Sequence, residues 1–249
     1  MKKLPVHNKQ LIDSLDTFRK SYYGTGIKFL VDRLEKEIVL HNKFIQDYNK
    51  TKEFLQTTKM DKVQIGSGHH KLSDWINLDL SVNADAQWDI REGLPFNDST
   101  IETIFIEHTL EHIDYPKSVH KFYEEAFRVL KPQGKLIIGV PDAKLAIRRY
   151  LLKDKIFFNK MLARWYKNRK SLQYLNTDID LLNYIFRDED NSDTYTPHLW
   201  AYDFKKLKQL AALNGFDKVK KWKFNDKIAN PKRKWASIYV ECKKPKEVK

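Results

Sequence analysis

The chain has 249 residues, of which 41% are hydrophobic, and it carries a formal net charge of +13. This apolar content can form a substantial core, which excludes wholesale disorder, and the single cysteine, Cys242, excludes an internal disulfide framework. No apolar run approaches the roughly 18 residues of a membrane helix, so we expect no membrane span. The two lysines near the start are not followed by the apolar region of a signal peptide, so we expect a cytoplasmic protein without one.

The positive charge comes mainly from lysine, with 36 lysines against 10 arginines. Arginine is the better bidentate ligand for phosphate, so this surplus is weak evidence for a nucleic-acid surface. The charge is concentrated at residues 148–170, where aromatic residues are interleaved with basic ones, and in the tail after Lys218. A solvated lysine-rich surface and an acidic partner such as RNA are both compatible with it.

Residues 1–60 are predicted to form an N-terminal helical extension. Leu11, Leu15 and Phe18 follow helical spacing, and after glycines at 24 and 26 the pattern continues to Phe44. Packing on the main domain is the simplest role for these helices. Covering a site and pairing two chains are the alternatives.

Residues 61–249 are predicted to form an α/β domain, because short apolar strands alternate with amphipathic helices. Strands are expected at 62–65, 75–80, 86–90, 103–107 and 135–140, and two closing strands at 217–224 and 235–242. Helices are expected at 116–130 and 199–216, and residues 143–196 are expected to form a helical lid or insertion.

Two glycines, Gly66 and Gly68, follow the first strand, and Asp79 ends the second. A glycine turn after a strand lets backbone approach a nucleotide-like ligand, and an acid on the next strand can bind ribose hydroxyls. Lys71 stands where the dinucleotide fingerprint has its third glycine, which argues against NAD. The connection 67–74 is also too short for a full crossover helix.

The order of three segments resembles a class I S-adenosylmethionine-dependent methyltransferase: IGSGHHKLSDWINLDL, then WDIREGLPFNDSTIETIFIEHTLEHI, then EEAFRVLKPQGKLIIGVPD. It is most similar to the type-11-like branch with a shortened first crossover, which acts on sugars or other small molecules. The resemblance runs from about 62 to 142 and resumes at 198–216. It implies a Rossmann-like, seven-stranded, mostly parallel sheet with an antiparallel last strand and helices on both faces, and S-adenosyl-L-methionine as cofactor.

By position, the resemblance implies cofactor contacts after each of the first four strands. Ile65, Gly66, Ser67 and Gly68 would lie under the methionine part, Asp79 would hold the ribose with Leu80 beside the adenine, Asp89 and Ile90 would sit at the adenine edge, and Glu107 and His108 would face the sulfonium. The family usually has a small residue in place of Glu107. A simple turn at the glycines, a solvated strand end at Asp79 and a turn at Asp89 are the structural alternatives.

The stretch IEHTLEH spells H-x-x-E-H through His108, Glu111 and His112, the inverted signature of a zinc protease. A zinc protease carries both histidines in a long helix, but the strand before His108 and the proline at 116 leave at most one turn. We therefore predict no metal. His108 is the first candidate for a general base, followed by His112 and His198, because histidine titrates near neutral pH. A purely structural role is the alternative for each, and Glu111 is expected to anchor the loop.

The sequence thus predicts methyl transfer to an oxygen or nitrogen of a small-molecule or glycan acceptor. An RNA methyltransferase that uses the basic segment and tail is the first alternative. A non-catalytic cofactor-binding or scaffold protein comes next, and a metalloprotease is last.

Overall fold

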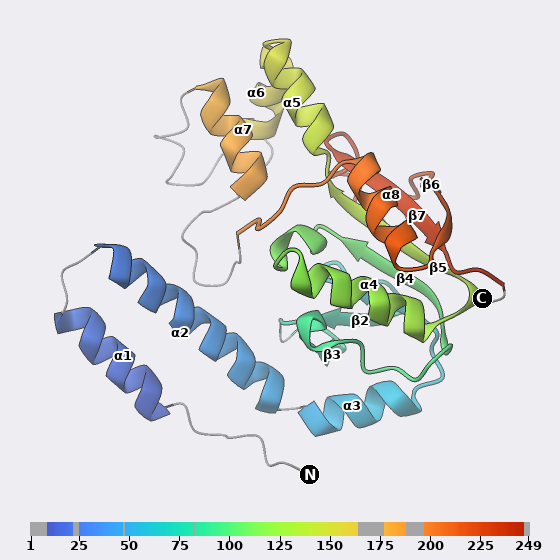
Figure 1. Ribbon diagram of the computed structural model, residues 1–249, viewed down its shortest axis with the longest axis horizontal. Helices are drawn as coiled ribbons and strands as arrows, with labels where there is room; N and C mark the ends of the chain where they lie inside the picture. Colours follow the sequence, from blue (N-terminus) through green and yellow to red (C-terminus); the bar gives the residue numbers. More distant parts are fainter. Residues whose placement is uncertain are drawn as a thin grey trace.

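The computed structural model describes residues 9–21, 25–46, 48–81, 83–163, 177–187 and 197–246. Its centre is a seven-stranded sheet of order β3-β2-β1-β4-β5-β7-β6, in which β7 runs antiparallel to both of its neighbours (Figure 1). The strands are β1 (Lys62–Ile65), β2 (Ile76–Asp79), β3 (Ala86–Gln87), β4 (Ile101–Glu107), β5 (Leu130–Pro141), β6 (Asp217–Lys221) and β7 (Ser237–Lys243). The Rossmann-like, mostly parallel sheet expected from the sequence is confirmed.

One face of the sheet carries the main core. Alternate side chains of β1, β2, β4, β5 and β7 pack there against α3 (Tyr48–Thr57), α4 (Lys117–Val129) and α8 (Phe204–Leu213). The helix expected at 116–130 is confirmed as α4, and its apolar residues at helical spacing are buried: Val119, Phe122, Ala126 and Val129. Each fully buried side chain of this size contributes roughly 1.5–3 kcal/mol relative to an exposed one.

The other face is covered differently from our expectation of helices on both faces. In the described part of the chain, the loops at 66–75 and 222–236 lie against it. Gln64 and Asn77 point to this side and bind the first loop: the backbone N–H of Leu72 donates to Gln64 Oε1 at 3.1 Å and to Asn77 Oδ1 at 2.8 Å. The shortened crossover is thus held by amide side chains, because a loop this short offers no apolar helix face.

The N-terminal extension consists of α1 (Lys9–Ser21), α2 (Thr25–Gln46) and α3. α1 and α2 lie side by side, apart from the sheet, and α3 lies next to β3, at the bottom of the view in Figure 1. Phe44 of α2 attaches the extension to the domain, since its ring meets Trp88 edge-on with centroids 5.0 Å apart. The helix break expected at 23–26 is shorter than predicted, because α2 already begins at Thr25, and residues 22–24 lie outside the described part of the chain.

Beyond the end of β5 stand α5 (Ala143–Leu151), α6 (Lys155–Met161) and α7 (Asp178–Arg187) (Figure 1). They share a small core of their own, in which Phe158 and Met161 pack with Leu181 and Ile185. The expected helical character of 143–196 therefore holds where the chain is described. Residues 164–176 and 188–196 lie outside that part.

The helix expected at 199–216 begins later, at Phe204. Asp203 caps it by accepting a hydrogen bond from the Lys206 N–H at 2.8 Å. The residues before it are extended, because Leu199 donates its N–H to the Glu111 carbonyl at 2.7 Å and Tyr202 bridges to Asp142. Among the described helices, none combines the length and apolarity needed to cross a membrane.

Candidate functional site

The glycine loop after β1 closes onto the end of β2. Gly66 and Gly68 have φ angles of 71° and 50°, in the left-handed region that glycine adopts without strain. The Gly66 N–H donates to the Leu78 carbonyl at 2.8 Å, and the Gly68 N–H donates to Asp79 Oδ2 at 2.9 Å. The structure therefore brings together the glycines and the acid that the sequence singled out.

The surroundings of Gly66 and Gly68 differ. A Cβ on Gly66 would lie 1.7 Å from Thr109 Oγ1, so the turn after β4 packs directly onto this backbone. A Cβ on Gly68 would meet nothing within 4 Å, so the loop faces open space there. Gly66 thus joins β1 to β4, and Gly68 leaves the loop accessible from outside.

Ser67 of this loop and Asp79 at the end of β2 both have unused hydrogen-bonding capacity. Ser67 is 4% exposed, and its Oγ has no hydrogen-bond partner among the described residues. Asp79 is half-buried and accepts one backbone N–H on each oxygen, the second being that of Ser81 at 2.8 Å, although a carboxylate has about four lone-pair sites. A polar ligand with hydroxyl groups fits this loop.

Asp89 and Ile90, expected at the adenine edge, follow β3 and are buried. The Asp89 carboxylate is engaged by Arg91, whose Nε lies 3.0 Å from both of its oxygens. Arg91 also donates to Glu37 of α2 at 2.8 Å, so this ion pair ties the extension to the loop after β3. Nearby, the carbonyl of the half-buried Leu80 accepts a hydrogen bond from Gln87 Nε2 at 3.2 Å.

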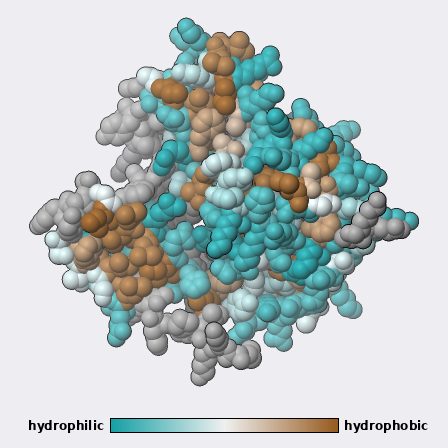
Figure 2. Space-filling model, in the orientation of Figure 1, coloured by the Kyte–Doolittle hydropathy of each residue, from teal (hydrophilic) through white to brown (hydrophobic). Residues whose placement is uncertain are grey.

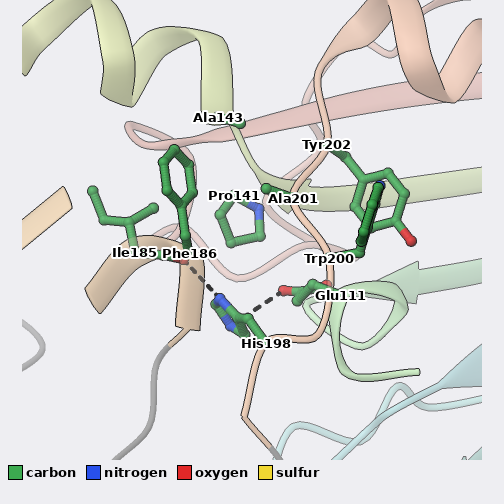
Figure 3. A pocket seen from close by; sticks show the side chains of 9 residues that line it. All are labelled: Glu111, Pro141, Ala143, Ile185, Phe186, His198, Trp200, Ala201 and Tyr202. Atoms are coloured by element: carbon green, nitrogen blue, oxygen red, sulfur yellow. Dashed lines mark hydrogen bonds and ion pairs between the residues drawn. The ribbon is translucent and has the colours of Figure 1, made fainter. Parts of the chain in front are cut away.

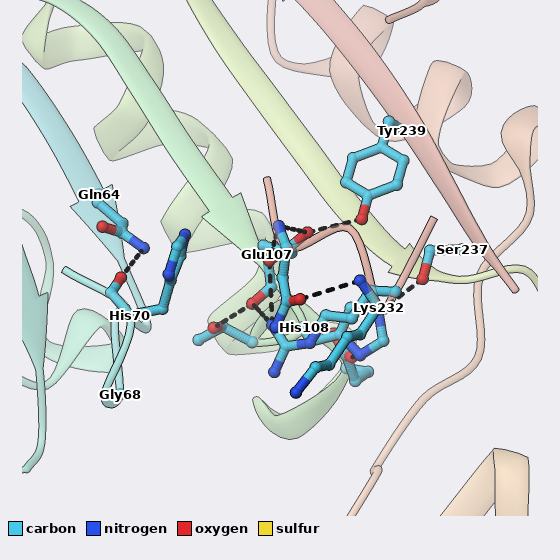
Figure 4. A network of polar contacts seen from close by, with 12 residues as sticks. Gln64, Gly68, His70, Glu107, His108, Lys232, Ser237 and Tyr239 are labelled. Carbon is cyan, nitrogen blue, oxygen red and sulfur yellow. Dashed lines mark hydrogen bonds and ion pairs between the residues drawn. The ribbon is translucent and has the colours of Figure 1, made fainter. Parts of the chain in front are cut away.

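Glu107 anchors the loop at 222–236, the second covering loop of this face of the sheet (Figure 4). Its buried carboxylate accepts hydrogen bonds from the Tyr239 hydroxyl at 2.6 Å, from Arg233 Nη1 at 3.2 Å and from the Asn230 N–H at 3.2 Å. These contacts occupy the carboxylate on the loop side of the sheet. They explain how an acid is accommodated at a position where the resembled family usually has a small residue.

The contact to Tyr239 depends on a glycine in the strand between. Glu107, Gly139 and Tyr239 form one row across β4, β5 and β7. A Cβ on Gly139 would lie 2.4 Å from Cε1 of the Tyr239 ring, so only glycine lets the ring cross β5. The sequence signal for this contact is the glycine inside KLIIGV, but the sequence alone does not pair it with Glu107.

His108, the first candidate base, directly follows β4 with φ 52°. Its Nε2 lies 2.7 Å from Ser237 Oγ, and its Nδ1 lies 3.7 Å from Glu111 Oε1. Burial lowers the pKa of this imidazole well below its ordinary value of 6.5, and the nearby Arg233 lowers it further. His108 is therefore neutral near pH 7 and can accept a proton, but with less driving force than an ordinary histidine.

The structure places the other two candidate histidines next to each other. The rings of His112 and His198 meet edge-on with centroids 4.7 Å apart, and Glu111 Oε1 lies 3.9 Å from His198 Nε2. Leu110–His112 is a single 3-10 turn, so the long helix of a zinc protease is absent here, as predicted. What the sequence did not show is that His198, from a distant segment, joins Glu111.

Glu111 and His198 also line a narrow pocket below α5 and α7 (Figure 3). Its other walls come from the end of β5 and from the extended segment before α8: Pro141, Ala143, Ile185, Phe186, Trp200, Ala201 and Tyr202. Polar groups on the sheet side and apolar groups on the helical side thus meet at the carboxyl edge of the sheet, where open α/β folds bind ligands.

Comparison with known proteins finds a family model that matches the central part of the chain. Residues 63–138 match a family model described as a methyltransferase domain. An uncharacterized protein of Methanocaldococcus jannaschii is 31% identical over 96 residues, and the match covers 35% of this chain and 41% of that protein. The chain therefore spans less than half of the length of this curated relative.

Two solved structures are similar in backbone. A SAM-dependent methyltransferase from Methanosarcina mazei is 17% identical with a TM-score of 0.46, and the likeness covers 76% of this chain and 95% of that one. A SAM dependent methyltransferase from Archaeoglobus fulgidus is 12% identical with a TM-score of 0.41, covering 84% of this chain and 94% of that one.

Proposed function

We propose that the chain is a class I S-adenosylmethionine-dependent methyltransferase, as the family match at residues 63–138 and the strand order favour, and that it transfers a methyl group to an oxygen or nitrogen of a small-molecule or glycan acceptor. The observation that carries the proposal is the glycine loop closed onto Asp79. It lies at the carboxyl ends of β1 and β2, where this class of sheet binds nucleotide-like ligands.

The cofactor would be held by residues at the ends of the first four strands. Ser67 Oγ and the remaining lone pairs of Asp79 suit the polar groups of an amino acid and a ribose, and Gly68 leaves room beside them. Ile65, Gly66 and Leu80 complete the expected floor, with Asp89, Ile90 and Glu107 at its margins. When bound, S-adenosyl-L-methionine supplies a methyl group made electrophilic by its sulfonium.

The binding site for the methyl acceptor would be formed by the residues that directly follow β4, here called the lip of β4. Methyl transfer is a displacement at carbon, which is helped by alignment of the acceptor and by removal of its proton. His108 is neutral and lies within one turn of His112 and near His198, so the acceptor would meet an imidazole there. His108 is the base that we assign first, and His112 and His198 are the next candidates.

The experiment that tests the cofactor site is a calorimetric titration of the purified chain with S-adenosyl-L-methionine. Loss of a hydrogen bond to a charged group costs about 1.5–3 kcal/mol, so Asp79→Ala should weaken binding roughly 10- to 150-fold. Asp226→Ala, at an exposed carboxylate in the 222–236 loop, is the matched control and should bind like the wild type. Absence of binding at millimolar cofactor, or an unchanged affinity in Asp79→Ala, would refute the proposal.

An RNA acceptor is the second candidate, because α5 and the turn after it expose basic side chains. Lys144, Arg148 and Lys153 are all exposed on this helical layer. Binding of RNA through such groups weakens steeply as salt concentration rises. A steep salt dependence of RNA binding would support this candidate, and no RNA binding at low salt would favour the small acceptor.

Pairing of two chains through the N-terminal helices is also a proposal. Ile27, Leu30 and Leu34 form one stripe on α2 and are 37%, 63% and 46% exposed, and Figure 2 shows apolar side chains gathered over α1 and α2. Such a contiguous apolar surface is typical of a contact site. Sedimentation of the wild type and of Leu30→Glu tests it, with a dimer expected only for the wild type.

A further inference from the structure

A cluster of three histidines and one glutamate lies at the lip of β4, outside the glycine loop. Glu111 and His112 come from the 3-10 turn after β4, His198 comes from the extended segment before α8, and His108 lies beside them. One ligand-type atom from each of Glu111, His112 and His198 can be chosen so that all three lie within 4.8 Å of one another. For metal–ligand bonds of about 2.0–2.2 Å, ligand atoms are separated by roughly 3.4 Å, so side-chain adjustments of about 1 Å complete the set.

The orientation of His198 suits a metal ligand. Its Nδ1 lies 2.8 Å from the Ile185 carbonyl oxygen, which can only accept, so Nδ1 carries the proton. In the neutral ring the lone pair is then on Nε2, the atom that faces Glu111 (Figure 3). A metal-binding histidine usually donates its second ring N–H to a carbonyl or carboxylate in this way.

Charge and burial point in the same direction. Glu111 is 1% exposed, and the ion-pair geometry places two imidazoles, His108 and His198, within 4 Å of its carboxylate. A buried carboxylate beside imidazole nitrogens is a donor set that divalent cations bind. Two histidines and a glutamate are also a ligand set of catalytic zinc and of related divalent transition metals.

We propose that Glu111, His112 and His198 bind one divalent transition metal ion of the zinc class. The site joins the lip of β4 to the segment that returns from the helical layer. The sequence predicted no metal because no long helix carries the H-x-x-E-H pattern. A site within one helix is indeed excluded, but His198 reaches the turn from 86 residues further along the chain.

Three protein ligands leave a coordination position for water. The pocket beside Glu111 and His198 has room of about 10 Å³ for a water-sized sphere, which suits a single water molecule. If the proposed methyl transfer is right, a water molecule bound there would lose its proton more readily, because a bound cation lowers the pKa of its oxygen ligands, and the resulting hydroxide could take the acceptor's proton. This last role rests on the proposed function, but the metal site does not.

The test uses the full chain without a histidine tag, stripped of metal by a chelator and titrated with Co²⁺. We expect one Co²⁺ per chain, with the visible absorption of a four- or five-coordinate ion. Glu111→Gln and His198→Gln should each weaken binding more than about 100-fold, because they remove a direct ligand. His120→Gln, on α4 and outside the cluster, is the matched control and should bind like the wild type.

A spectroscopic measurement on the wild type covers the case in which a variant does not fold. The Cu²⁺-loaded chain should show hyperfine coupling to at least two imidazole nitrogens in electron paramagnetic resonance. Absence of stoichiometric Co²⁺ binding, a copper signal without nitrogen coupling, or variants that bind like the wild type would each overturn the site. Calorimetry with S-adenosyl-L-methionine on the stripped protein separates this outcome from failure of the proposed function, since cofactor binding does not require the metal.

Discussion

The hydrogen bond from Tyr239 to Glu107 allows a quantitative test of how the second covering loop is held. Both side chains are buried, and the hydroxyl lies 2.6 Å from Glu107 Oε1. Tyr239→Phe removes this hydroxyl but keeps the ring over Gly139, so the packing is preserved. A hydrogen bond to a charged group contributes about 1.5–3 kcal/mol, and we expect the free energy of unfolding to fall by that amount.

For a chain of this size, about 1 kcal/mol lowers the unfolding midpoint by roughly 2–4 °C, so the expected loss is roughly 3–12 °C. Circular dichroism during thermal and urea unfolding measures it. Glu107→Gln combined with Tyr239→Phe should cost less than the two single changes added together, because both remove the same contact.

Tyr123→Phe is the matched control for this experiment. Tyr123 is fully buried on the other face of the sheet, and its hydroxyl has no hydrogen-bond partner among the described residues. Removing that hydroxyl should leave stability unchanged or raise it, because a buried polar group without a partner is destabilising. If Tyr239→Phe behaves like Tyr123→Phe, or if the two changes at Glu107 and Tyr239 are additive, the anchoring role of Glu107 is wrong.

Two further predictions concern the turn and the histidine next to it. Gly66→Ala should lower the unfolding midpoint and abolish cofactor binding in calorimetry, because its Cβ would overlap Thr109, whereas Gly26→Ala in α2, with nothing nearby, should stabilise the chain by up to about 1 kcal/mol. The pKa of His108 is lowered on folding, so the unfolded chain binds the additional proton below pH 6.5, and the stability present above that pH should be lost as the pH falls toward the folded pKa. Unfolding midpoints measured between about pH 7.5 and 5 should fall less steeply in His108→Gln; parallel profiles would contradict the assignment.

The main elements of the fold could be predicted because their signals are local. The stripe of α4 and the apolar strands β4 and β5 follow from spacing within a dozen residues. The start of α8 could not be predicted from spacing, since Leu199 to Tyr202 fit the helical pattern as well. Their backbone groups instead bind Glu111 and Asp142, which are remote in the sequence.

In the candidate site, too, some contacts could be predicted from the sequence and others could not. Gly66, Gly68 and Asp79 could be predicted to meet, because parallel neighbouring strands end at the same edge of a sheet. The partners of Glu107 lie more than 120 residues away and depend on the gap at Gly139, and the joining of His198 to Glu111 depends on how the segment before α8 returns. Interactions of this kind require knowledge of three-dimensional register, which periodicity does not supply.

The amide-held loop on the second face of the sheet has a consequence for local stability. A crossover helix would bury an apolar stripe, whereas the loop at 66–75 buries one large apolar side chain, Leu72, and otherwise exchanges hydrogen bonds with the side chains of Gln64 and Asn77. Segments with few buried apolar contacts open at a lower free energy than the whole domain. Opening of this loop alone should therefore cost less free energy than unfolding of the core between the sheet and α4.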